Sequence, residues 1–326
     1  MPYADAFFGE SSTSLYKAQL STRTDIVSIK MNTYHMFTLD SSGNLYSSGW
    51  TNSSQMGRNT SAPNEIHKLA QCLTSVSSFS PHGNGCWAVK TDGTLWWAGN
   101  ISNYATSSDT GQGTTLSPSS GWYQFGSDTD WIKVDGWISF PAKSMAIKGG
   151  TGAEYVYVCG QNTYYATGLG TTSGYTKPWT RIKSAASTNW SETIADLSVG
   201  MDSSLFVTKS GKLFSCGEAN YGVQGQGNTT DQPYVNQIGT DTDWATPYAK
   251  ARTTGYCIKT DGSLYGSTNS TFNWGITPTT ADRTYRQIGS DTDYQELRTI
   301  DVTYLYGKEI MFPSHDQGPI GLRYFQ

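Results

Sequence analysis

Apolar residues recur along this chain as pairs of short runs separated by a tight polar turn. The pattern reads AVKTDGTLWWAG over residues 88–99, similar copies span 37–49, 206–217 and 257–267, and a looser copy with an enlarged turn spans 146–160. Asp-Gly or Ser-Gly between apolar runs supplies the positive-φ positions of a tight hairpin turn. Each copy is therefore predicted to form a β-hairpin.

The strands of these hairpins are apolar on both faces. Because side chains alternate along a strand, Leu95 and Trp97 point to one side and Trp96 and Ala98 to the other. A strand buried on both faces needs a layer packed on each side, which the neighbouring blades of a propeller supply. The turn glycines recur with a period of roughly fifty to sixty residues, in the range of propeller blades. They are Gly43, Gly93, Gly211 and Gly262.

A second repeated element joins one hairpin unit to the next. Its clear copies follow the pattern Gln-[Phe/Ile]-Gly-[Ser/Thr]-Asp-Thr-Asp-[Trp/Tyr] and begin at Gln124, Gln237 and Gln287. Degenerate copies are expected over 19–26 and 182–190, and an eroded one near 69–78. Counting these linkers predicts six four-stranded blades in one all-β domain over residues 1–326.

The two ends of the chain are predicted to share a blade. Residues 295–315 offer three apolar strands without a fourth, and residues 14–18 resemble the strand before the last linker, 284–286. An N-terminal strand that completes the C-terminal blade would close the ring and cover two sheet edges. Residues 316–326 belong to no blade in this count and are predicted to be a C-terminal docking tail.

Charge and hydropathy narrow the function classes. The formal net charge is −4 and only 15% of residues are charged, so the sequence offers no basic stripe to grip a nucleic acid. No apolar run approaches the roughly eighteen residues that a membrane span needs. No signal peptide is recognisable at the N-terminus. We therefore expect a protein made in the cytoplasm, with no nucleic-acid partner and no membrane insertion.

The search for catalytic chemistry finds no motif. Five cysteines without Cys-x-x-Cys spacing argue against a disulfide framework and a zinc site, and favour buried free thiols. The four histidines are scattered, and no nucleophile elbow, phosphate-binding loop or His-Glu-x-x-His pattern occurs. We predict no enzyme, no catalytic residue and no cofactor.

The Asp-Thr-Asp segments of the linkers invite a comparison with calcium loops. Calcium takes several carboxylate and carbonyl oxygens, but here an aromatic residue follows instead of further acids and a glycine. Asp and Thr at a strand entry commonly bond to their own backbone. We therefore predict structural turns and no metal for these repeat positions, which are Asp128, Asp130, Asp241, Asp243, Asp291 and Asp293.

The segments after the hairpins carry a family resemblance. Residues 217–229 read GEANYGVQGQGNT, with looser versions at 49–57, 160–170 and 273–275. This is similar to the regulator-of-chromosome-condensation (RCC1) repeat, whose blades run from an apolar strand through an Asp-Gly turn to a glycine-rich loop. The resemblance implies a β-propeller. The best-known members have seven blades, which leaves seven as the alternative to six. The Asp-Thr-Asp-Trp linker is similar to one in repeat proteins of bacteria and their viruses.

Aromatic residues in the loops between hairpins form the predicted recognition face. Large rings with low conformational entropy, set among Ser, Thr, Asn and Gly, are typical of binding surfaces. The alternative for each ring is packing between blades. These residues are Trp50, Tyr104, Trp122, Tyr164, Tyr165, Tyr175, Trp179, Tyr221, Phe272 and Trp274.

Three functional hypotheses follow. The first is a phage structural protein, located on the virion tail or capsid, that binds other virion proteins and a host surface protein or glycan. The second is a microbial propeller that binds or inhibits a partner protein. The third, by family analogy alone, is guanine-nucleotide exchange on a small GTPase.

Overall fold

The computed structural model describes residues 24–31, 35–49, 56–58, 69–82, 85–99, 121–137, 143–150, 152–162, 164–172, 174–184, 188–220, 222–250, 254–268 and 283–294. These residues form twenty β-strands and contain no helix. Consistent with this, the described part of the chain has no helix that could span a membrane.

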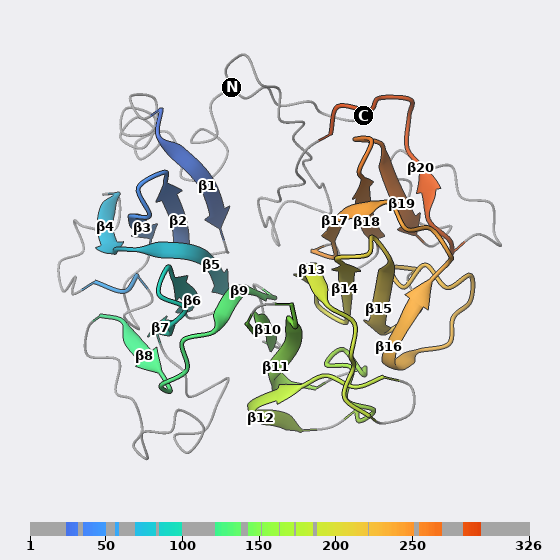
Figure 1. Ribbon diagram of the computed structural model, residues 1–326, viewed down its shortest axis with the longest axis horizontal. Helices are drawn as coiled ribbons and strands as arrows, with labels where there is room; N and C mark the ends of the chain where they lie inside the picture. Colours follow the sequence, from blue (N-terminus) through green and yellow to red (C-terminus); the bar gives the residue numbers. More distant parts are fainter. Residues whose placement is uncertain are drawn as a thin grey trace. The chain divides into compact units, whose positions relative to one another are not determined.

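The strands form five four-stranded antiparallel sheets, each assembled from consecutive strands (Figure 1). The first contains β1 (Ile26–Met31), β2 (His35–Asp40), β3 (Leu45–Gly49) and β4 (Ala70–Leu73), and the second β5 (Val76–His82), β6 (Gly85–Lys90), β7 (Leu95–Gly99) and β8 (Tyr123–Phe125). The third contains β9 (Trp131–Gly136), β10 (Lys143–Lys148), β11 (Tyr155–Gln161) and β12 (Tyr175–Arg181). The fourth contains β13 (Ile194–Val199), β14 (Ser203–Thr208), β15 (Leu213–Gly217) and β16 (Gln232–Ile238), and the fifth β17 (Trp244–Tyr248), β18 (Thr254–Lys259), β19 (Leu264–Thr268) and β20 (Arg286–Gln287).

The chain divides into two compact units between Val134 and Asp135, within β9. Among described residues, the first unit holds the β1–β4 and β5–β8 sheets and the start of β9. The second unit holds the rest of the third sheet and the β13–β16 and β17–β20 sheets. Residues 14–18, 295–315 and 316–326 lie outside the described residues, as do the predicted sixth blade, ring closure and docking tail that depend on them.

The predicted hairpins are confirmed. They are the pairs β2–β3, β6–β7, β14–β15 and β18–β19, and the looser copy forms β10–β11. Every residue of β2, β14 and β15 is buried, so these strands are covered on both faces, whereas β11 of the looser copy alternates between half-buried and buried residues. The turn glycines all have positive φ, between 75° and 81°.

The linkers pack directly on these turns. The amides of Trp131 and Trp244 donate to the carbonyls of Gly93 and Gly211, each at 3.0 Å. A Cβ added to Gly211 would lie 2.0 Å from the carbonyl oxygen of Thr242, the central residue of the Asp-Thr-Asp segment. Glycine is thus required both by φ and by the close approach of the next linker.

One linker boundary was predicted wrongly. The segment expected over 182–190 continues to Ile194, whose amide donates at 3.1 Å to Glu154 in the enlarged hairpin turn. Trp190 instead donates its amide to Ile182 at 3.0 Å, and its ring packs edge-on against Phe206. The boundary differs because, in the enlarged turn, the carbonyl that accepts the linker amide belongs to Glu154, whereas in the other turns it belongs to a glycine. The eroded linker near 69–78 is confirmed, because the Val76 amide donates to Gly43 at 2.8 Å.

The cysteines are free, and three of them are buried. Burial raises the pKa of the Cys86 and Cys257 thiols, and it raises that of Cys216 to about 12, so these groups stay protonated. Cys72 and Cys159 are only half-buried, and Cys72 lies in β4.

Candidate functional site: the loop end of the sheets

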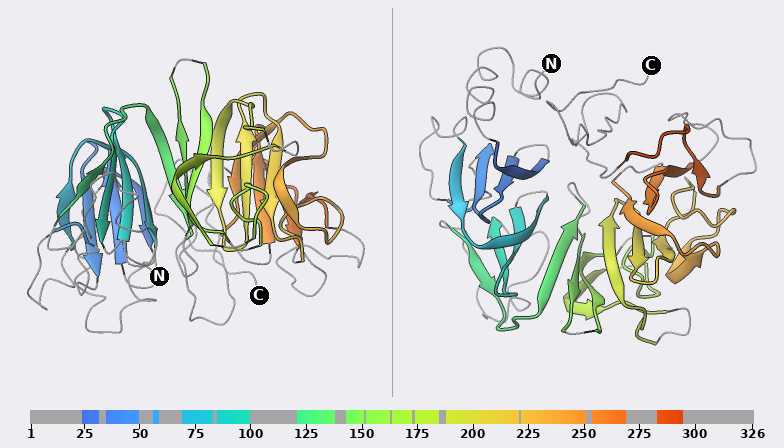
Figure 2. Two further views of the ribbon diagram at one scale, coloured as in Figure 1. Left: turned by 90° about the horizontal axis from the view of Figure 1, so that it is seen from below. Right: turned by 45° about the horizontal axis from the view of Figure 1, so that its top comes forward.

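Each sheet has two distinct ends. In a four-stranded antiparallel meander, the connections between strands one and two and between strands three and four lie at one end. The central hairpin turn and the linker to the next sheet lie at the other. We call these the loop end and the linker end. In the left view of Figure 2 the strands of the second unit run vertically, and the β10–β11 hairpin of that unit projects at the top, on the linker end.

The linker end of the second unit carries ion pairs at its surface. Lys259 Nζ lies 2.7 Å from Asp241 and 3.0 Å from Asp243, and 4.7 Å from the centre of the Trp244 ring. Although burial alone would lower it, hydrogen bonds to both aspartates raise the pKa of Lys259 above its ordinary value. Lys212 and Glu192 form a further pair at 3.0 Å.

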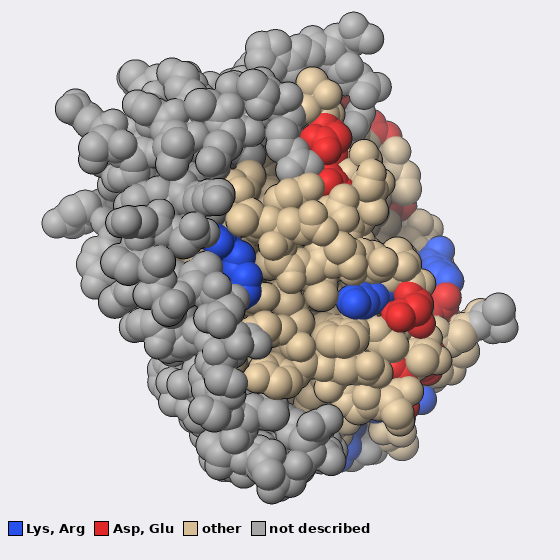
Figure 3. Space-filling model, turned by 90° about the vertical axis from the view of Figure 1, so that its left-hand side faces the viewer, with Lys and Arg blue, Asp and Glu red and all other residues tan. Residues whose placement is uncertain are grey.

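The predicted turn aspartates all lie at this end of their sheets. All six side chains are exposed, and those of Asp241 and Asp243 pair with Lys259. Within the described ranges no group of three or more His, Cys, Asp or Glu could hold a metal ion. Charged side chains are only scattered over the described surface on the side shown in Figure 3.

At the loop end, the segment 162–172 after β11 is organised around one buried amide. Asn162 accepts a hydrogen bond from Thr167 Oγ1 at 2.6 Å and donates from Nδ2 to Thr171 Oγ1 at 2.5 Å. The Gly168 amide donates to the Tyr165 carbonyl at 2.9 Å. An Asn with both ends of its amide satisfied by the same loop fixes the path of that loop.

The same segment is anchored to the neighbouring sheet. The Gly170 amide donates to the Pro233 carbonyl of β16 at 2.9 Å, and Ser204 Oγ of β14 donates to the Ala166 carbonyl at 3.3 Å. A Cβ on Gly170 would lie 2.5 Å from the Tyr234 ring. The backbone of this loop is therefore fixed to β14 and β16 without any contribution from the Tyr164 side chain.

The next loop, 218–231, repeats this construction. The Gly225 amide donates to the Gly222 carbonyl at 3.0 Å, and the Gly227 amide donates to the Arg283 carbonyl of the following sheet at 2.9 Å. Gln224 is buried and donates from Nε2 to the Cys216 carbonyl at 2.7 Å. The glycine-rich segments therefore serve as loop-to-sheet anchors.

The predicted recognition aromatics occupy several environments. Tyr164 is 48% exposed, Tyr165 is half-buried beside it, and Trp179 is half-buried with its indole nitrogen inside. Tyr175 begins β12. Five of the predicted recognition aromatics lie outside the described residues, and these are Trp50, Tyr104, Tyr221, Phe272 and Trp274.

Trp122 packs within the first unit. Its ring lies edge-on to Phe37 at 6.4 Å and fills the space at the α-carbon of Gly57. In the second unit Val235 and Tyr285 take the same place against Gly168 and Gly225. All three stand two positions before a repeated linker glutamine, a signal of sheet-to-sheet packing that the sequence analysis missed.

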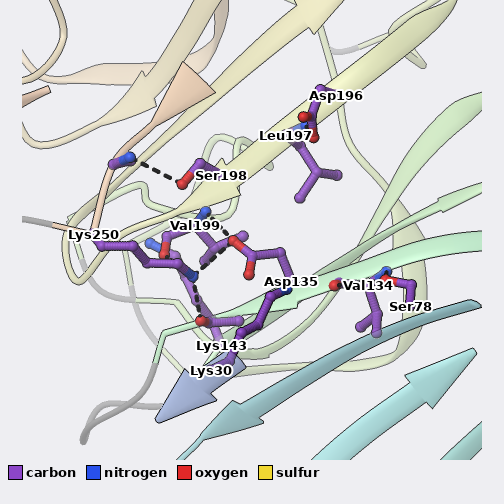
Figure 4. Close-up of polar contacts among 12 residues, drawn as sticks. Lys30, Ser78, Val134, Asp135, Lys143, Asp196, Leu197, Ser198, Val199 and Lys250 are labelled. Carbon is purple, nitrogen blue, oxygen red and sulfur yellow. Dashed lines mark hydrogen bonds and ion pairs between the residues drawn. The ribbon is translucent and has the colours of Figure 1, made fainter. Parts of the chain in front are cut away.

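A buried polar network at the ends of the inner strands was also missed (Figure 4). Lys250 Nζ lies 2.7 Å from Asp135 Oδ2 and donates to the carbonyls of Gly136 at 2.7 Å and Val199 at 3.0 Å. Asp135 Oδ2 also accepts the Val199 amide at 2.8 Å. In the same way Ser198 Oγ accepts the Ala249 amide at 2.9 Å. These contacts join successive sheets of the second unit.

Lys143 adds a second buried amine to this region. Its Nζ donates to the carbonyls of Met201 at 3.1 Å and Ser203 at 3.3 Å. Burial lowers its pKa from 10.5 to about 7. Above this pKa the amine is neutral and keeps two N–H donors, which these two carbonyls satisfy. The signal for Asp135 and Ser198 was their shared position, four residues after Trp131 and Ile194 at the strand starts.

Comparison with known proteins supports a fold assignment. No family model and no curated protein sequence matches the chain. Yeast RCC1 (Prp20) bound to Kap60 is similar in structure, with a TM-score of 0.53 and 13% identity over 81% of this chain and 75% of that one. Prp20p from Saccharomyces cerevisiae has a TM-score of 0.53 and 13% identity over 81% of this chain and 77% of that one. Human WBSCR16 has a TM-score of 0.57 and 16% identity over 78% of this chain and 69% of that one. The chain therefore has an all-β β-propeller fold similar to that of these proteins, as predicted.

Proposed function

We propose that this chain is a non-enzymatic binding protein that recognises a macromolecular partner through the loop end of its sheets. The observation that carries the proposal is the contrast within the 162–172 loop. Its backbone is fixed by bonds to β14 and β16, while Tyr164 stands 48% exposed. A ring presented on a rigid support loses little entropy on binding.

The similar structures support a protein partner. Prp20 has been solved bound to Kap60, and binding of Prp20p to Gsp1p and histones is described. A propeller of this type can therefore serve as a docking platform. The partner of this chain is a separate question, since fold likeness does not carry a partner from one protein to another.

For the biological setting we propose a phage virion, with the chain on the tail or capsid and other virion proteins and a host surface molecule as partners. The support is the resemblance of the Asp-Thr-Asp-Trp linker to repeat proteins of bacteria and their viruses. A microbial propeller that binds or inhibits a cellular protein is the alternative. Antibody against the chain should label purified particles in the first case and only the soluble cell fraction in the second.

Site-specific photo-crosslinking tests the binding surface. A photoreactive amino acid at Tyr164 should form an adduct with an identified partner in the native source. The matched control places it at Lys209, whose side chain is 53% exposed at the linker end. Adducts from position 209 alone, or from neither position, would overturn the loop end as the recognition surface.

Nucleotide exchange on a small GTPase is a second candidate function. The observation that favours it is the structural similarity to yeast RCC1 and to Prp20p, for which Gsp1p binding is described. The chain would accelerate release of a fluorescent guanine nucleotide from Gsp1p. A release rate equal to that without the chain would remove this candidate.

A further inference from the structure

Two adjacent tyrosines at the loop end adopt a backbone conformation that large side chains rarely take. Tyr164 has φ 51° and Tyr165 has φ 61°. For bulky residues a left-handed conformation is an outlier, and such strain collects at ligand-binding sites. Neither side chain makes a hydrogen bond or ring contact with another described residue. Within the described chain the strain is therefore not offset by a hydrogen bond or ring contact of either side chain, although Tyr165 is half-buried.

The neighbouring loop shows that the fold does not need a tyrosine here. Gly222 occupies the place of Tyr165, with φ 80°. The turn is otherwise the same, because the Gly225 amide donates to Gly222 at 3.0 Å as the Gly168 amide donates to Tyr165 at 2.9 Å. Glycine builds this turn without strain. The Tyr165 side chain thus has a role other than forming the turn.

The surroundings of the pair define the chemistry of a ligand. Residues 155–176 contain no charged side chain and are rich in hydroxyl, amide and aromatic groups. Thr171 and Thr172 are exposed in the same loop. Thr171 Oγ1 accepts a bond from Asn162, which leaves its O–H free to donate outward. Such a surface matches a neutral ligand with many hydroxyls and an apolar ring face.

We propose that the Tyr164–Tyr165 turn binds a neutral carbohydrate. The inference rests on the proposed function, in which the loop end is the recognition surface. The C–H face of a sugar ring stacks on the Tyr164 ring, and the tyrosine and threonine hydroxyls bond to the sugar hydroxyls. A protein ligand is the less suitable occupant, because about a quarter of residues in an average protein are charged and this segment offers no charge to pair with them.

Binding of the full-length chain to a printed array of neutral, sialylated and sulfated oligosaccharides tests the proposal. Neutral glycans should bind, and their affinity should be unchanged in 0.5 M salt, since only interactions between charges are screened at that ionic strength. Tyr164→Ala should lower the affinity by about tenfold or more, whereas Tyr164→Phe should keep most of it.

The backbone strain at Tyr165 allows a second test, which measures the melting temperature. Tyr165→Gly should raise the melting temperature by about 2–4 °C, since it relieves the left-handed conformation. The same substitution should weaken glycan binding. A lower melting temperature would show that Tyr165 supports the fold and would overturn its assignment to the ligand.

The remaining outcomes each contradict the proposal. Failure of all glycans to bind would overturn it, as would binding confined to acidic glycans and lost in salt. Unchanged binding by Tyr164→Ala would place the sugar elsewhere. If glycans fail while the photo-crosslinker at residue 164 captures an identified protein, the proposed function stands and only the ligand class is wrong.

Discussion

The two ends of the second-unit sheets use lysine in opposite ways. At the linker end, Lys212 pairs with Glu192, each about one-third exposed, and Lys259 pairs with Asp241 and Asp243, which are half-exposed although Lys259 itself is only 10% exposed. At the loop end, the side chain of Lys143 is buried and that of Lys250 is 14% exposed, and both donate to backbone carbonyls. Exposed pairs contribute little, whereas a buried ammonium must be satisfied by partners that are costly to remove. The exposure of the paired groups, and not the number of ion pairs, therefore decides which charges stabilise this fold.

The ends also differ in what their repeated motifs do. The linker end repeats Asp-Thr-Asp against a turn glycine, so its side chains and backbone serve the packing of one sheet on the next. The loop end repeats glycine anchors, and between them exposed side chains such as Tyr164 alternate with buried ones such as Asn162 and Gln224. Sequence variation can therefore accumulate at the exposed positions of the loop end without loss of the fold, which is the arrangement expected for a binding surface on a rigid scaffold.

We expect the largest loss of stability when a side chain is added to a turn glycine at the linker end. Gly211→Val should destabilise the chain by about 4 kcal/mol or more, because a Cβ there would lie 2.0 Å from the Thr242 carbonyl oxygen and φ is 75°. Urea unfolding followed by tryptophan fluorescence measures the loss. Gly239→Ala is the matched control. It has φ 60° with nothing within 4 Å, so only the backbone strain of about 1–2 kcal/mol should appear.

Equal losses for these two glycine variants would mean that the linker does not press on the turn. The repeated Asp-Thr-Asp segment would then need another explanation.

We expect the next largest loss of stability when the Asp135–Lys250 ion pair at the loop end is broken. Asp135→Ala leaves Lys250 without its carboxylate partner, whose side chain is only 7% exposed, and should cost about 3–5 kcal/mol. Thermal unfolding monitored by circular dichroism measures it. Replacing both residues together, with Asp135→Leu and Lys250→Met, should recover most of the loss because no charge remains buried. A double variant as unstable as Asp135→Ala would contradict this account.

A pH dependence of stability should come from Lys143. Its pKa is about 7 in the folded chain against an ordinary 10.5, so the unfolded chain binds more protons between these values. Stability should therefore rise with pH from about 7, by about 2 kcal/mol up to pH 9. Above pH 9 the raised pKa of Cys216 acts in the opposite direction, since the unfolded thiol ionises first. Lys143→Met should abolish the rise, and an unchanged profile in this variant would assign it to another group.

The fold was largely predictable because the same local signals recur. The Asp-Gly turns between apolar runs specified the hairpins, and the Asp-Thr-Asp linkers marked the passage from one sheet to the next. The one boundary error, at Trp190, arose where the hairpin turn is enlarged and the expected aromatic stands four residues before the true strand start, Ile194. A short motif cannot reveal which residue will bond to the preceding turn.

The candidate site was predictable only in outline. Loop aromatics pointed to the loop end, but composition could not separate Tyr164, which is exposed, from Trp122, which packs on Phe37. The strain at Tyr165 depends on a φ value that a sequence does not display. Likewise, Lys143 and Lys250 are not part of any repeat, so their burial follows from the packing of the sheets and has no local signature.

The smallest effect should come from an exposed linker-end pair. Lys212 and Glu192 are 3.0 Å apart, with side chains 32% and 33% exposed. Holding two long side chains in one geometry opposes the Coulomb attraction, which water also screens. A double-mutant cycle with Lys212→Ala and Glu192→Ala should thus give a coupling energy of about 0.5 kcal/mol or less in urea unfolding, falling further in 0.5 M salt. A coupling near that of a buried pair would mean that the two ends do not differ in how they use lysine, and the stability of the second unit would then rest on its charges throughout.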